Sequence, residues 1–95
     1  MRYYYLFVRR GGAPAPAMAR FRHALAREGW LPGGAPGVYF RLGRENPARR
    51  VAELAPEGVF CRLMPVDAAD WGARQEVVAG RVNPDDAEAS LGLAK

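Results

Sequence analysis

The chain has 95 residues, of which 49% are hydrophobic and 25% are charged, and a net charge of +4. This composition is typical of one folded domain and excludes a disordered chain. No apolar run approaches the ~20 residues of a membrane span, and the apolar start lacks a signal-peptide cleavage site, so we expect a cytoplasmic protein without a membrane segment. The single cysteine excludes an internal disulfide and leaves too few ligands for a zinc cluster.

Charge is divided unevenly along the chain. Residues 1–50 contain ten arginines and two acidic residues, a net charge of +8, whereas residues 51–95 contain three arginines, one lysine and eight acidic residues, a net charge of −4. A basic half on a small domain indicates a polyanionic partner, most often nucleic acid. Codon bias in a GC-rich genome also enriches arginine, so the arginine content has two possible explanations. Codon bias explains poorly why the arginines cluster in one half of the chain.

The apolar spacing alternates between strand and helix periods. In chain order, the predicted elements are a strand at residues 3–8, a helix at 17–28, a short extended piece at 30–31, a strand at 37–42, a helix at 48–55, a strand at 59–66 and a short strand at 75–79. In the first helix, Met18, Phe21 and Leu25 share one face, and Gly29 ends the helix. Asn46 followed by proline caps the second helix.

This order predicts an α+β fold of the ferredoxin-like, split βαβ type. One antiparallel sheet would carry two helices on one face. We expect the domain to span residues 1–80, because the polar and small residues 81–95 read as a C-terminal tail.

The exit of the first strand carries charge but no acid. The strand ends in Val8, Arg9 and Arg10, and no acidic residue precedes Glu28. Two adjacent guanidinium groups can contact phosphates by charge and hydrogen bonding. Two solvated arginines at a strand end are the alternative.

Six further arginines are candidates for nucleic-acid binding, and they occupy the two helices and the turn between them. They are Arg20 and Arg27 on the first helix, Arg41 and Arg44 around the following turn, and Arg49 and Arg50 at the start of the second helix. His23 shares the face of Arg20 and Arg27 but has no partner for catalysis, and such a stripe is also typical of a solvated face. Cations at a helix start oppose the helix dipole, which favours a functional role for Arg49 and Arg50.

Several short motifs occur in a fixed order over residues 1 to about 80. They are FRHAL at 21–25, EGW at 28–30, GVYFR at 37–41, REN at 44–46, RV at 50–51, PEGV at 56–59 and LMPVD at 63–67. In this order and spacing they resemble the CRISPR-associated Cas-two family, the small subunit of the spacer-acquisition machinery of antiviral defence. The resemblance rests on collinearity, because no single motif is specific.

The resemblance implies a non-catalytic subunit that holds double-stranded DNA and bridges copies of the CRISPR integrase subunit. It also implies a homodimer in which the final strand completes the partner's sheet, with Trp71, Val77 and Val78 at the interface. Family members reported as nucleases place a metal-binding aspartate where this chain has Val8. Valine offers no ligand to a hard cation, so we expect no metal, no cofactor and no cleavage.

Two other functions stay open. Leu6-Phe7-Val8 is similar to the first signature of an RNA-recognition motif, although GVYFRL fits the second signature poorly. A residual nuclease would have to use Asp67 or Asp70 with Glu45 and Glu57, whose spacing does not favour it. We interpret the two aspartates as turn-capping residues and Cys61 as a buried apolar residue.

Overall fold

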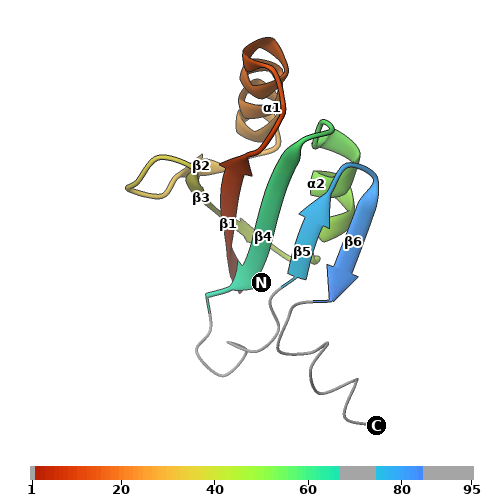
Figure 1. Cartoon of the computed structure of the whole chain (residues 1–95). Coiled ribbons are helices and arrows are strands. Elements are labelled where there is room, and N and C mark those ends of the chain that lie inside the picture. Colours follow the sequence, from red (N-terminus) through yellow and green to blue (C-terminus); the bar gives the residue numbers. More distant parts are fainter. Residues whose placement is uncertain (1, 67–74, 85–95) are drawn as a thin grey trace, which may run out of the picture.

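The computed structural model describes residues 2–66 and 75–84, which form one sheet and two helices (Figure 1). In chain order the elements are β1 (Arg2–Arg10), α1 (Ala15–Arg27), β2 (Leu31–Pro32), β3 (Val38–Gly43), α2 (Ala48–Leu54), β4 (Val59–Pro65), β5 (Gln75–Val78) and β6 (Arg81–Pro84). The strand order is β2-β3-β1-β4-β5-β6, and every neighbouring pair is antiparallel. The predicted α+β fold, with a βαβ-type arrangement, is confirmed at this level.

β1 lies between β3 and β4 and gives the sheet two chemically different faces. Successive side chains of a strand point to opposite faces. Tyr4 and Leu6 are buried in the core, whereas Tyr3 and Phe7 are exposed on the opposite face. The uninterrupted apolar run at the N-terminus therefore supplies both faces of the sheet.

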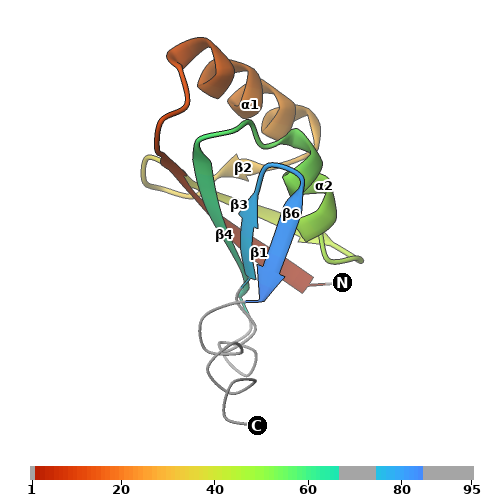
Figure 2. The same ribbon diagram turned by 45° about the vertical axis from the view of Figure 1, so that its right-hand side comes forward.

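Both helices pack against the same face of the sheet (Figure 2). Phe21 and Leu25 of α1 lie in one buried cluster with Val51 of α2 and Leu6 of β1. The period of 3.6 residues brings these α1 positions onto one stripe, as the sequence predicts. The core therefore lies between the helix layer and one face of the sheet.

Gly29 ends α1 as predicted, and the geometry explains why glycine is needed there. Its φ is 93°, a left-handed conformation that residues with a side chain rarely adopt. The Gly29 N–H donates to the carbonyl of Ala26 at 3.1 Å, and the Trp30 N–H donates to the carbonyl of Leu25 at 3.0 Å. This pair of bonds is a Schellman motif, and it directs the buried Trp30 back onto the core.

Asn46 holds the start of α2, although the N-cap is Pro47 and not Asn46 as predicted. Its Oδ1 accepts a hydrogen bond of 2.8 Å from the N–H of Ala48, which has no partner within the helix. Its Nδ2 donates to Oε1 of Gln75 at 2.7 Å. The loop before α2 is thereby tied both to its own helix and to β5.

The sheet extends further than the sequence indicates. The sequence predicts a tail from residue 81, but Arg81–Pro84 forms β6 and pairs with β5 through a two-residue turn at 79–80. Gly80 has φ 70°, and its N–H donates to the carbonyl of Ala52 on α2 at 2.8 Å. The turn at 79–80 connects β5 to one further strand. The domain boundary that we predict at residue 80 therefore falls inside the β5–β6 hairpin. Residues 85–95 lie outside the described residues.

Candidate nucleic-acid interface

Arg9 and Arg10 do not act as a pair, because adjacent residues of β1 point to opposite sides of the sheet. Arg10 lies on the helix side, where its Nε donates to the carbonyl of Ala13 at 2.7 Å. Arg9 lies on the open side, with its guanidinium carbon 5.4 Å from the centre of the Phe60 ring. This distance allows a cation–π contact.

α1 exposes three arginines and carries no carboxylate of its own. Arg20, Arg22, His23 and Arg27 are all exposed, and no acidic residue occurs within the helix. None of the three arginines makes an ion pair within residues 2–66 and 75–84. Arg22 was not among the sequence candidates, yet it lies outside the apolar stripe of the same helix, and that position was the available signal.

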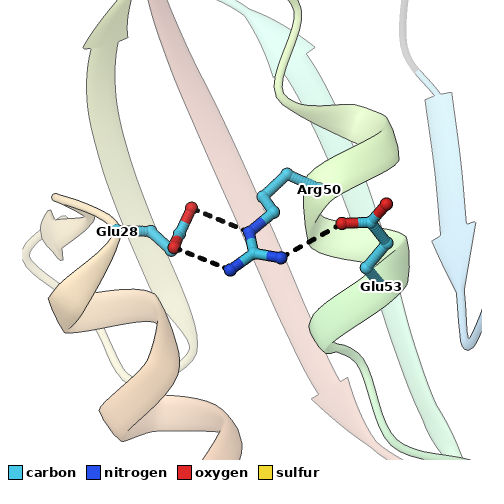
Figure 3. A network of polar contacts seen from close by, with 3 residues as sticks. All are labelled: Glu28, Arg50 and Glu53. Atoms are coloured by element: carbon cyan, nitrogen blue, oxygen red, sulfur yellow. Dashed lines mark hydrogen bonds and ion pairs between the residues drawn. The ribbon is translucent and has the colours of Figure 1, made fainter.

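Arg50 differs from the other candidates because its guanidinium is occupied by carboxylates of its own chain (Figure 3). Nε and Nη2 donate to the two carboxylate oxygens of Glu28, each at 3.1 Å, and Nη1 donates to Glu53 at 3.1 Å. The hydrogen bonds from Arg50 lower the pKa of Glu28, and those to Glu28 and Glu53 raise the pKa of Arg50. The network joins the end of α1 to α2 and leaves Arg50 poorly placed to bind a phosphate.

Arg41 and Arg44 lie beside this network, in a cleft of about 360 Å³ between the end of β3 and the start of α2. We call it the β3–α2 cleft. Arg41 is half-buried and Arg44 is exposed, and within the described ranges neither makes an ion pair. Arg49 is exposed on α2 and is not part of the cleft lining.

The face of the sheet opposite the helices is apolar, and no motif in the sequence predicts a role for it. Its exposed side chains come from β1, β2, β3 and β4 and from the residue after β4: Tyr3, Phe7, Leu31, Leu42, Phe60 and Val66. Phe60 is 48% exposed and Leu31 is 53% exposed. We call this surface the open sheet face. The signal for it was the apolar run of β1, which is too continuous for a strand with one solvated face.

A cleft of about 490 Å³ lies on the open sheet face. Phe7 and Phe60 line it together with Arg9, Arg62 and Glu76. Arg62 Nη2 and Glu76 Oε2 are 3.2 Å apart. The cleft thus combines aromatic rings with an ion pair and a second guanidinium.

Val77, which the sequence predicts at a dimer interface, lies in the interior of the sheet. Val77 is fully buried and pairs with Cys61 of β4 and Val82 of β6 in the same chain. The premise that residues 75–79 form an open terminal edge is therefore wrong, because β6 covers that edge. Val78 is half-buried, and Trp71 lies outside the described residues.

Among the described residues, no group of metal-binding side chains lies at the end of β1. In residues 2–66 and 75–84, no three His, Cys, Asp or Glu side chains lie close enough to hold a metal ion. Asp67 and Asp70 lie outside these ranges, so the expected absence of nuclease activity stays a prediction. Cys61 is buried, and burial raises the pKa of its thiol to about 12.

None of the described helices is long and apolar enough to cross a membrane. Comparison of the chain with protein-family models, curated proteins and solved structures finds no match.

Proposed function

We propose that this protein is a non-catalytic, cytoplasmic subunit that holds double-stranded DNA on its helix layer. The observation that carries the proposal is the exposed, acid-free surface of α1. Arg20 and Arg27 lie two helical turns apart, about 10 Å along the axis, on a helix that also exposes Arg22. Duplex DNA presents one negative charge per ~1.7 Å of its axis, so a basic helix of this length faces several phosphates.

The resemblance to the CRISPR-associated Cas-two family gives this binding a context. The order β-α-β-β-α-β of the first six elements supports a ferredoxin-like assignment, with β5 and β6 as an extension of the sheet beyond β4. In that context the protein bridges copies of the CRISPR integrase subunit during spacer acquisition. The valine at position 8 supports a holding role without cleavage, because it cannot bind a metal ion.

The open sheet face supports the homodimer that the resemblance implies. Contiguous exposed apolar surface is typical of protein–protein interaction sites. A second copy that packs on Tyr3, Phe7 and Phe60 would bury these rings and leave both helix layers outward, each with its own arginines. We therefore place the dimer interface on this face rather than at Val77 and Val78.

Duplex binding measured at several salt concentrations tests the DNA proposal. The logarithm of the binding constant should fall with the logarithm of salt concentration, by about 0.9 for each phosphate neutralised. Arg20→Ala, Arg22→Ala and Arg27→Ala should each flatten this slope by about 0.9. Arg81→Ala is the matched control, because Arg81 is also exposed but lies on β6 in the acidic half. Equal slopes for all four variants would contradict the proposal.

The sheet-face cleft favours a second candidate function, single-stranded RNA binding of the RNA-recognition-motif type. Aromatic side chains on an open sheet can stack bases, and Arg9 could contact the backbone next to Phe60. Phe60→Ala separates the two functions. If it lowers affinity for single-stranded RNA and leaves the oligomeric state unchanged, the RNA module is favoured. If it disrupts a dimer and leaves duplex contacts on the helix layer intact, the DNA-holding subunit is favoured.

A further inference from the structure

The β3–α2 cleft combines more guanidinium groups than carboxylates. Arg41, Arg44 and Arg50 line it together with Glu28 and Glu45, and Glu53, the second partner of Arg50, is not part of the lining. Because Arg50 is paired with Glu28 and Glu53, the guanidinium groups left for a ligand are those of Arg41 and Arg44. Guanidinium groups bind phosphate through paired, charge-assisted hydrogen bonds, which makes arginine the usual residue for this contact.

The hydrogen bonds decide which arginines remain for a ligand. Arg50 donates from Nε and Nη2 to Glu28 and from Nη1 to Glu53, so all three guanidinium nitrogens hydrogen-bond to carboxylates of the same chain (Figure 3). Arg41 and Arg44 make no ion pair with any described residue. The two arginines that can donate to a ligand are therefore Arg41, which is half-buried on β3, and Arg44, on the loop that follows.

We propose that the β3–α2 cleft binds one phosphate group, with Arg41 and Arg44 as donors and Arg50 as a positioning residue. Assigning this phosphate to the backbone of the bound nucleic acid rests on the proposed function, whereas phosphate binding itself does not.

Arg50 acts through Glu28. The positive charge of Arg41 contributes to the lowered pKa of Glu28, so the two side chains interact electrostatically. The two hydrogen bonds from Arg50 hold the Glu28 carboxylate toward α2. Without Arg50, Glu28 is free to pair with Arg41 and to neutralise the donor that the phosphate needs.

This arrangement predicts a rescue. Arg50→Ala should weaken phosphate binding although Arg50 does not donate to the phosphate, and adding Glu28→Gln should restore it, because the amide cannot neutralise Arg41. A direct phosphate contact by Arg50 predicts no rescue. Glu45→Gln should strengthen binding severalfold, since it removes the remaining acid of the cleft.

The direct test follows the Nε–H signals of Arg41 and Arg44 by NMR while inorganic phosphate is added at constant ionic strength. We expect both signals to shift with saturation, and the Arg49 signal to stay in place as the control. Acetate, which carries a charge but a different shape, should shift them less. Signals that do not move, or that move equally with acetate and with Arg49, would overturn the proposal.

Duplex DNA then separates this inference from the proposed function. Arg41→Ala and Arg44→Ala should each flatten the salt dependence by about 0.9, whereas Arg81→Ala, at an exposed position on β6, should not. If the wild type binds no duplex but its cleft signals respond to phosphate, the proposed function fails and the phosphate site stands. If duplex binds and the variants at 41 and 44 match the variant at 81, the cleft inference fails alone.

Discussion

The two sides of the sheet differ in what they offer to a partner. The helix layer presents arginines, of which those on α1 have no ion-pair partner in the described chain. The open sheet face presents apolar side chains, with Arg9 lying against Phe60. A polyanion needs the first kind of surface, and burial against a second apolar surface needs the other. A small domain can therefore hold nucleic acid on one side and form a dimer through the other.

Leu6 and Phe7 provide the sharpest comparison of the two sides, because they are neighbours on β1. Leu6 is fully buried against the helices, and Phe7 is 37% exposed on the open sheet face. Leu6→Ala should lower the free energy of unfolding by about 2–5 kcal/mol at any protein concentration, since it leaves a cavity in the core. If the proposed dimer forms, Phe7→Ala should lower it mainly at protein concentrations where that dimer is populated.

Chemical denaturation at several protein concentrations, with sedimentation to follow the oligomer, measures both effects. Ala26→Glu, an exposed change on α1, is the control that should leave the dimer intact. A Phe7→Ala effect that does not depend on concentration would remove the dimer from the open sheet face.

Cys61 tests the difference between the buried and the open side of the sheet on β4. It is buried toward the helices, between Phe60 and Arg62, which both line the open-face cleft. Because burial raises the pKa of the thiol to about 12, we expect it to react with a thiol reagent at pH 8 far more slowly in the native protein than after unfolding. The folded pKa lies above the ordinary value of 9.0, so this group should lose stabilising effect as pH rises from about 9 toward 12. Equal reaction rates before and after unfolding would show that the helix layer does not seal the core.

Arg9 and Arg10 test on which side of the sheet the proposed duplex-binding surface lies. Arg10 points to the helix side and Arg9 to the open side. Arg10→Ala should flatten the salt dependence of duplex binding by about 0.9, and Arg9→Ala should leave the slope unchanged. The reverse result would move the duplex onto the open sheet face.

The sequence predicts the elements of this molecule better than their use. Met18, Phe21 and Leu25 predict α1 and its buried stripe, and Gly29 predicts its end, because these signals act within a few residues along the chain. The role of Val77 was missed, since only pairing with β6 shows that its strand is interior. The division of Arg9 from Arg10 follows from strand alternation alone and was available from the sequence.

The candidate site is harder to predict than the fold, because a sequence does not show which arginines form ion pairs. Arg50 looked equivalent to Arg49, and only the approach of Glu28 from α1 distinguishes them. The two residues are 22 positions apart, so no local pattern links them. The β3–α2 cleft depends on the same packing of α1 against α2.

The smallest effect we predict concerns the Glu28–Arg50 pair. Hydrogen bonding from Arg50, followed by the charges of Arg50 and Arg41, lowers the pKa of Glu28 from its ordinary value of 4.5. A carboxyl whose pKa is lower in the folded state stabilises the fold above its unfolded pKa and loses that effect as pH falls through the folded value. The melting temperature of the wild type should thus slightly exceed that of Glu28→Gln near pH 7, and the difference should vanish well below pH 4.5 and shrink in high salt.

Glu57→Gln, at an exposed position without an ion pair in the described ranges, is the control that should show no such trend. A difference that persists in acid would mean that Glu28 stabilises α1 through packing rather than charge, and Arg50 would then have no carboxylate to hold away from Arg41.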